Sequence, residues 1–239
     1  MTTINSLPFQ LLLLPGLAAD ATMWREQLDA LAAWQPQVTN VHTRHETIPA
    51  MAGALLAQYP GRLVLCGASM GGMVAMEAAR QAPERVAGLA LLGTNAEPET
   101  PEMRKLREDA IELFAQGRVA EVIEPNVHLA FHPDQAARAD LRQAYLDFVL
   151  RAGADQLVRQ NRAVIGRPDA REHLGALRCP VLVLCGEDDL LTPPDKSRAI
   201  AALVPQAQLQ LLPRCGHMLT MEQPAAVNAA LADWLRTLG

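Results

Sequence analysis

The chain has 239 residues, half of them hydrophobic, and a formal net charge of −5 at pH 7. This length fits one large domain, and the apolar content excludes an intrinsically disordered chain. The charge is mild, and lysines and arginines are scattered, which argues against a nucleic-acid-binding protein because such a protein would carry a basic patch or stripe.

The first apolar run, QLLLL at residues 10–14, ends at a Pro-Gly pair. A short continuous run of this kind is typical of a strand buried on both faces of a sheet. No lysine or arginine precedes Arg25, so the segment lacks the basic start of a signal peptide. It is also far shorter than the roughly 20 residues that cross a bilayer. We therefore expect a central strand and no membrane association.

Short apolar runs alternate with helical patterns along the rest of the chain. Strands are expected at 10–14, 37–42, 62–67, 86–93, 180–186 and 207–212, and helices at 22–33, 49–58, 70–81, 194–203 and 224–238. This alternation predicts an α/β fold with a mostly parallel sheet of about six strands and helices on both faces.

One interval, residues 96–177, contains amphipathic helical stretches and no convincing strand. An insertion at the carboxyl end of a strand in an open α/β sheet is well placed to build a ligand site. We expect a helical cap at 96–177, inserted after the fourth strand into a core domain made of 1–95 and 178–239. A separate helical subdomain without a role in access is the alternative.

The four cysteines have no metal-type spacing such as C-x-x-C. Cys66 and Cys185 lie inside apolar runs, where a free cysteine behaves as a small buried hydrophobe. We expect reduced thiols and a cytoplasmic location.

The stretch GASMG, residues 67–71, matches the pattern G-x-S-x-G between a predicted strand and a predicted helix. In the strand–turn–helix setting of a nucleophile elbow, such a serine stands exposed at the carboxyl edge of the sheet. Ser69 would need an adjacent base to act as a nucleophile, and His217, after the last predicted strand, is the candidate. A carboxylate near 188–189 could orient the imidazole, and Glu187, Asp188 and Asp189 are adjacent there.

Taken together, these motifs resemble the α/β-hydrolase family over nearly the whole chain outside the cap, in particular a serine esterase-like member with a helical cap. The family's acid pattern, G-x-x-D-x-x-x-P, runs from Gly186 to Pro193 and points to Asp189. The family's histidine pattern, G-H followed by E-x-P, is matched by Gly216, His217, Glu222 and Pro224.

The resemblance further implies an oxyanion hole made by the backbone N–H groups of Leu17, after Gly16, and of Met70. Three departures from the family are visible. Pro15 stands where the family usually has a histidine, the loop HTRHETIP replaces a frequent glycine-rich turn, and the N-terminal hairpin of many members is missing. The last departure predicts a six-stranded core.

The pocket is harder to assign from the sequence. Leu17, Met70, Leu191 and Met218 are candidate lining residues, and Trp24 is explained equally well by substrate contact or core packing. Most of the apolar cap residues are expected to pack internally, with one or two facing the substrate: Met103, Phe114, Phe131, Tyr145 and Phe148.

The remaining histidines favour structural roles. His128 and His132 have the spacing of metal ligands, but Pro133 follows and no HExxH-type glutamate is present, so we expect ordinary cap residues and no metal. His42 and His45 flank a loop and are expected to face solvent.

The implied function is hydrolysis of small, uncharged carboxylic esters by Ser69, His217 and Asp189 through an acyl-enzyme, with no cofactor, in a monomer or homodimer. Thioester, lactone and carbon–carbon bond hydrolysis and perhydrolysis are compatible with the same residues. A serine at position 69 argues against the dehalogenases and epoxide hydrolases of this family, which use aspartate there. A ligand-binding protein that keeps the fold is the alternative of another class, and a scaffold protein has no support in the sequence.

Overall fold

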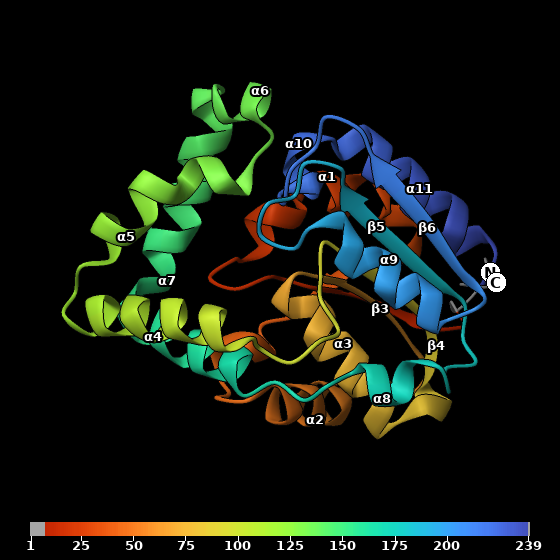
Figure 1. Ribbon diagram of the computed structural model, residues 1–239. Helices are drawn as coiled ribbons and strands as arrows, with labels where there is room; N and C mark the ends of the chain where they lie inside the picture. Colours follow the sequence, from red (N-terminus) through yellow and green to blue (C-terminus); the bar gives the residue numbers. More distant parts are fainter. Residues whose placement is uncertain (1–7, 239) are drawn as a thin grey trace, which may run out of the picture.

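The computed structural model describes residues 8–238. At its centre is a six-stranded parallel sheet with the strand order β2-β1-β3-β4-β5-β6 (Figure 1). The strands are β1 (Gln10–Leu14), β2 (Gln37–Val38), β3 (Leu63–Ala68), β4 (Val86–Leu92), β5 (Val181–Gly186) and β6 (Ala207–Leu212). The predicted α/β architecture is confirmed.

Helices cover both faces of the sheet because the inner strands are apolar on both faces. Alternate residues of a strand point to opposite faces: Leu11 and Leu13 belong to one buried cluster, and Leu12 and Leu14 to the other. The first cluster includes α11 (Pro224–Arg236) and lies against α1 (Arg25–Ala30). The second includes α2 (Ile48–Gln58), α3 (Met70–Gln81) and α9 (Pro194–Leu203).

The strand order reverses beside β1. The chain passes from β1 outward to the edge strand β2, then returns to the other side of β1 and continues through β3 to β6. In open α/β sheets, ligands bind at the carboxyl ends of the strands where the order reverses. In this fold, Gly16 follows the carboxyl end of β1 and Ser69 follows the carboxyl end of β3.

Two predicted elements are shorter than expected. The strand expected at 37–42 ends at Val38, and Val41–Thr43 forms a 3-10 turn that carries His42 inward to bond with Ala19. The helix expected at 22–33 is divided into a 3-10 turn (Ala21–Trp24), α1 and a second 3-10 turn (Ala32–Trp34).

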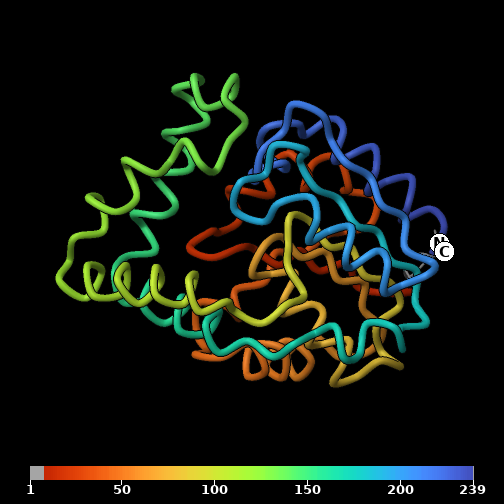
Figure 2. The backbone as a smooth tube through the Cα atoms, viewed as in Figure 1, coloured from red at the N-terminus to blue at the C-terminus, as the bar shows by residue number. Residues whose placement is uncertain are grey.

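Between β4 and β5 the chain leaves the sheet and forms five helices (Figures 1 and 2). Four of them stand to one side of the core, and the fifth packs against α9. They are α4 (Pro101–Ala115), α5 (Val119–Asn126), α6 (Pro133–Ala136), α7 (Ala139–Ile165), which breaks at Gly153, and α8 (Arg171–Leu174). The exact division between cap and core stays a prediction. Within residues 8–238, no helix combines the length and hydropathy needed to cross a bilayer.

Candidate active site

Ser69 lies on a sharp turn between β3 and α3. Its φ of 52° and ψ of −118° are unusual for a residue with a side chain, and such backbone strain is typical of functional sites. A Cβ at position 67 would lie 2.4 Å from the Gly71 carbonyl oxygen, and one at position 71 would lie 2.1 Å from the Leu14 oxygen. Glycine is therefore required on both sides of Ser69, because any side chain there would collide with backbone.

The backbone holds this turn in place. The Ser69 amide donates to the Leu92 carbonyl of β4 at 2.9 Å, and the Ser69 carbonyl accepts from the Thr94 hydroxyl at 2.7 Å and from the Gly72 amide at 2.9 Å. The Ser69 side chain is half-buried and lines the main cavity. The backbone of Ser69 is thus fixed by hydrogen bonds to β4, to Thr94 and within the first turn of α3.

His217 and Asp189 are hydrogen-bonded to each other. His217 Nδ1 lies 2.8 Å from Asp189 Oδ2, and Asp189 is only 2% exposed. The Asp189 Oδ1 atom accepts the amides of Leu191 at 2.9 Å and Thr192 at 2.8 Å. Asp188 has a half-exposed side chain that lies 3.7 Å from His132 Nε2 instead. Of the three adjacent carboxylates, Asp189 is therefore the one that reaches His217.

Thr192 completes this arrangement and was missed by the sequence analysis. Its hydroxyl donates to Asp189 Oδ2 at 2.8 Å and lies 3.2 Å from His217 Nδ1. The residue sits immediately before Pro193 in the acid pattern, so its position was visible although its role was not. It restricts the Asp189 carboxylate to the rotamer that faces His217.

Opposite charges shift the pKa values of this pair in opposite directions. Burial acts to raise the pKa of Asp189, but the charge and hydrogen bond of His217 and the bonds from Thr192 outweigh it and leave the pKa below its usual value. Burial acts to lower the pKa of His217, but the charge and hydrogen bond of Asp189 and the charge of Glu222 raise it above its usual value. An ionised Asp189 beside a more basic His217 suits proton acceptance by the imidazole.

The turn after β1 brings Gly16 against Ser69. The Ala19 amide donates to the Gly16 carbonyl at 3.2 Å, and because a trans peptide directs its N–H opposite to its C=O, the Leu17 N–H faces the other way. A Cβ on Gly16 would lie 3.3 Å from the Ser69 Cβ, so the turn contacts the serine directly. Met70 is the first residue of α3, where the amide has no intrahelical partner. Leu17 and Met70 both line the cavity.

Gln160 holds this turn from the cap side and was also missed. It is fully buried in α7, its Oε1 accepts the Ala18 amide at 2.7 Å, and its Nε2 donates to the His42 carbonyl at 3.0 Å. Ala18 has a φ of 59°, a left-handed conformation that a non-glycine residue adopts only when its surroundings hold it there. A glutamine within a helix has no sequence signature for such a contact.

The expectation that His42 faces solvent is wrong. The side chain is 4% exposed, and His42 Nε2 lies 2.8 Å from the Ala19 carbonyl oxygen. Because that oxygen can only accept, Nε2 carries the proton. Burial, the largest influence, lowers the pKa of His42 and keeps the ring neutral. His42 thus supports the same turn that Gln160 holds.

A cavity of about 380 Å³ opens between the sheet edge and the cap. Ser69 and His217 line it, together with four predicted pocket residues: Leu17, Met70, Leu191 and Met218. Trp24 does not, because it is fully buried in the core. Four of the five apolar cap residues expected to be mainly internal also face the cavity, namely Met103, Phe114, Tyr145 and Phe148. More of the cap therefore contributes to the cavity wall than the sequence suggested.

Glu222, from the histidine pattern, joins the histidine loop to the cap. Its carboxylate accepts the Gly216 amide at 3.0 Å and the His132 amide at 2.8 Å. Burial, the largest influence, raises the pKa of Glu222. The His128 ring contacts the Pro125 carbonyl, and the His132 ring accepts the Asp134 amide, as expected for structural cap residues. Within residues 8–238, no cluster of three potential metal ligands is found.

Comparison with known proteins agrees with the fold. Residues 42–224 match the family described as the alpha/beta hydrolase fold. The chain is 27% identical to a pimeloyl-[acyl-carrier protein] methyl ester esterase of Aromatoleum aromaticum, over 95% of this chain and 98% of that protein. It is also 27% identical to the biotin biosynthesis bifunctional protein BioHC of Cellvibrio japonicus, over 95% of this chain and 48% of that protein. The chain thus spans about half the length of that relative.

Among solved structures, a thermophilic esterase from Thermogutta terrifontis superposes with a TM-score of 0.84 at 30% identity, covering 96% of this chain and 90% of that one. The family match covers more than half of the sequence, and the strand order and the serine turn after β3 agree with it. The chain belongs to the α/β-hydrolase fold family.

Proposed function

We propose that the chain is a serine hydrolase that cleaves small carboxylic esters, with Ser69 as nucleophile, His217 as general base and Asp189 as the carboxylate that orients it. The observation that carries this proposal is the 2.8 Å bond between Asp189 and His217, with His217 lining the same cavity as Ser69. A histidine in contact with a buried carboxylate, near a serine on a strained turn, is the arrangement that activates a hydroxyl nucleophile.

In the first half-reaction, the Ser69 hydroxyl attacks the ester carbonyl and its proton passes to His217 Nε2. The amides of Leu17 and Met70 stabilise the oxyanion, and such donors are worth about 3 kcal/mol each in comparable sites. The tetrahedral intermediate then collapses, the bond to the alcohol breaks and His217 returns the proton to the leaving oxygen. In the second half-reaction, water gives a proton to His217 and its oxygen attacks the acyl-enzyme, releasing the acid and restoring Ser69.

The similar proteins and the lining of the cavity both support an ester as the substrate. Two of the proteins to which the chain is similar are named as esterases. Aliphatic and aromatic side chains make up most of the cavity wall, which suits an acyl chain. Thioester, lactone and carbon–carbon bond substrates use the same residues and remain the alternatives, as does a hydrolase-like protein that only binds its ligand.

The test is hydrolysis of p-nitrophenyl esters from acetate to octanoate, with labelling by a fluorophosphonate probe in parallel. We expect saturable turnover with one optimum of acyl length and labelling of Ser69. Turnover of matched thioesters or lactones without turnover of any ester would replace the ester proposal by one of those alternatives. A folded protein that is neither labelled nor active would favour the ligand-binding alternative.

A second expected result concerns Gln160. Replacing it by leucine removes the acceptor of the Ala18 amide, so the turn that presents the Leu17 N–H loses its support. We expect kcat to fall about tenfold or more with little change in KM, because the turn contributes to the transition state rather than to substrate binding. Steady-state kinetics on the best ester would measure this.

The control is Gln143→Leu, a change at an exposed glutamine of the same helix, which should keep the wild-type kcat. Equal kcat values for Gln160→Leu and the wild type would show that the turn holds its conformation without this contact.

A further inference from the structure

Arg107 lies on the wall of the catalytic cavity. Among the lining residues that the structure describes, it is the one permanently charged side chain, and no carboxylate belongs to the lining. The prediction of uncharged substrates was based on the matched motifs, which contain no basic residue, and Arg107 lies outside those motifs. A cation in a mainly apolar cavity must be compensated by a partner or by a ligand.

The position of Arg107 follows from the helical repeat of α4. Met103, Leu106, Ala110 and Phe114 line the cavity from the same helix, at the spacing of one helical face. Arg107 belongs to that face. The chain therefore places a guanidinium at a position where the repeat alone would favour an apolar residue.

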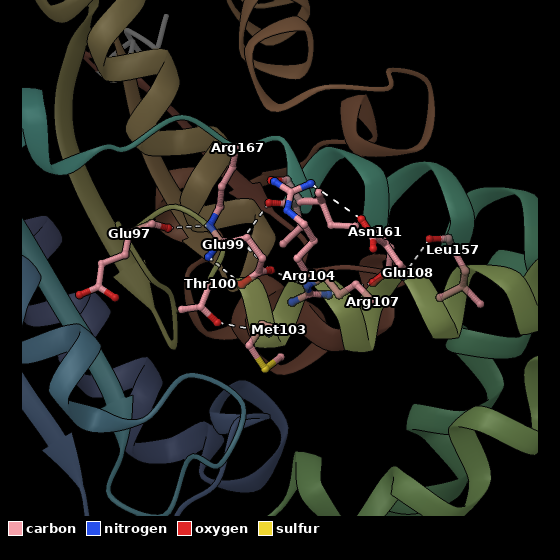
Figure 3. A network of polar contacts seen from close by, with 12 residues as sticks. Glu97, Glu99, Thr100, Met103, Arg104, Arg107, Glu108, Leu157, Asn161 and Arg167 are labelled. Carbon is pink, nitrogen blue, oxygen red and sulfur yellow. Dashed lines mark hydrogen bonds and ion pairs between the residues drawn. The ribbon is translucent and has the colours of Figure 1, made fainter.

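The guanidinium is held in place by two contacts, which Figure 3 shows. Arg107 Nε donates to Glu99 Oε2 at 2.6 Å, and Nη1 donates to Asn161 Oδ1 at 2.8 Å. Asn161 in turn donates to the Leu157 carbonyl at 2.9 Å, so its oxygen is directed at Arg107. These contacts restrict Arg107 to one arrangement, which lowers the entropy lost when a ligand binds.

Glu99 does not neutralise Arg107, because it is shared with a second arginine. Arg167 donates from Nη1 to Glu99 Oε2 at 2.9 Å and from Nη2 to Oε1 at 3.3 Å. Arg167 and Glu99 are both about 95% buried, at 4% and 5% side-chain exposure, whereas the Arg107 side chain is 25% exposed. One carboxylate and two guanidiniums leave a net charge of +1, and Arg107 is its accessible member.

A guanidinium has five N–H donors, and the two contacts of Arg107 engage Nε and one N–H of Nη1. The remaining donors suit an anion, and a carboxylate matches them with two parallel, charge-assisted bonds. We propose that Arg107 binds the carboxylate of an acidic ester, a substrate that carries a free carboxylate at the end remote from the scissile bond. This assignment rests on the proposed ester hydrolysis at Ser69.

The cavity geometry supports such a substrate. Ser69 lies at the carboxyl edge of the sheet, while Arg107 belongs to the cap, and both line one cavity. A ligand held at both points spans core and cap, with its methylene chain along the apolar wall between them. The cap then selects the substrate by charge as well as by shape.

The test compares monomethyl adipate, which carries a carboxylate, with methyl 6-amino-6-oxohexanoate, in which a neutral carboxamide replaces it. For the wild type, we expect kcat/KM to favour the acid by about 10- to 100-fold, mainly through KM, the effect of a charge-assisted hydrogen bond. In Arg107→Gln this ratio should fall to near one. The acetate ester of 6-hydroxyhexanoate and its carboxamide would show whether the carboxylate belongs on the alcohol side instead.

The matched control is Arg104→Gln, an arginine of the same helix that contacts the Ile165 carbonyl and lies outside the cavity lining. It removes the same charge and should keep the acid preference. Arg107→Gln leaves Glu99 paired with Arg167, so a folding defect is not expected, and thermal denaturation would check this.

The possible outcomes separate the two proposals. Ester turnover without acid preference in the wild type, or a preference that survives Arg107→Gln, overturns the Arg107 site and leaves the hydrolase proposal intact. If no ester is cleaved, calorimetric binding of hexanoate against hexanamide tests the site alone. Tighter binding of hexanoate that depends on Arg107 then supports the Arg107 site, and equal affinities for hexanoate and hexanamide overturn it.

Discussion

Replacement of Ser69 by alanine is expected to lower kcat for ester hydrolysis by about 10⁶-fold, to a weak background, as removal of the nucleophile does in well-studied serine hydrolases. The fold should be unaffected, because the hydrogen bonds at this position that anchor the turn to Leu92 and Thr94 use main-chain atoms. Alanine keeps the Cβ and therefore the same backbone strain. Steady-state kinetics, thermal denaturation and intact-mass analysis after fluorophosphonate treatment would measure rate, stability and labelling.

Ser197 offers a matched control for this experiment. It is fully buried in α9 and does not belong to the cavity lining. Ser197→Ala should retain both turnover and labelling. Substantial serine-type turnover in Ser69→Ala would mean that another group is the nucleophile, and the mechanism proposed above would be wrong.

Replacement of Asp189 by asparagine is expected to lower kcat by about 10⁴-fold, by analogy with the best-studied triad. The Leu191 and Thr192 amides donate to Oδ1, so the asparagine oxygen would occupy that place and direct its NH₂ group at His217 Nδ1. The imidazole would then accept at Nδ1 and carry its proton on Nε2. In that tautomer Nε2 cannot take the proton of Ser69.

The pH dependence provides a second readout of the same variant. His217 must be neutral to act as a base, so kcat/KM should rise with pH through the pKa of His217. Because Asp189 and Glu222 raise that pKa, the acid limb of the wild type should have its midpoint above the ordinary histidine value of about 6.5. Asp189→Asn removes the main raising influence and leaves burial, which lowers the pKa, so the midpoint should move to lower pH.

Asp188→Asn is the control because its side chain is half-exposed and directed at His132. It should change kcat little and leave the pH profile in place. Greater damage from Asp188→Asn than from Asp189→Asn would reverse the assignment of the acid.

Local constraints explain what the sequence made predictable. The turn at Ser69 requires glycines because backbone atoms approach within collision distance of a Cβ, and such a requirement leaves a visible pattern at residues 67–71. The pairing of Asp189 with His217 follows from two loops that succeed adjacent strands, β5 and β6, in one parallel sheet. Strand alternation therefore made most of the core predictable, and the spacing of the acid pattern pointed to the carboxylate that contacts His217.

Contacts between distant segments were not predictable. Gln160 meets Ala18 across 142 positions of sequence, and nothing in the helix around it indicates that contact. His42 was expected in solvent because it flanks a loop, yet the 3-10 turn directs it inward to Ala19. Arg107 was missed for another reason. The repeat of α4 was visible, but which of its faces meets the cavity depends on how the cap is placed.

The position of Glu222 has a consequence for the independence of the cap. Its carboxylate binds Gly216, next to His217, and His132 of the cap, and the Met218 amide donates to Ala130 at 3.0 Å. A cap transplanted from a relative would bring its own residues to these bonds, and a misfit there would displace His217. Exchange of this insertion is thus expected to alter turnover as well as substrate range, unless residues 130–132 and 216–222 are inherited together.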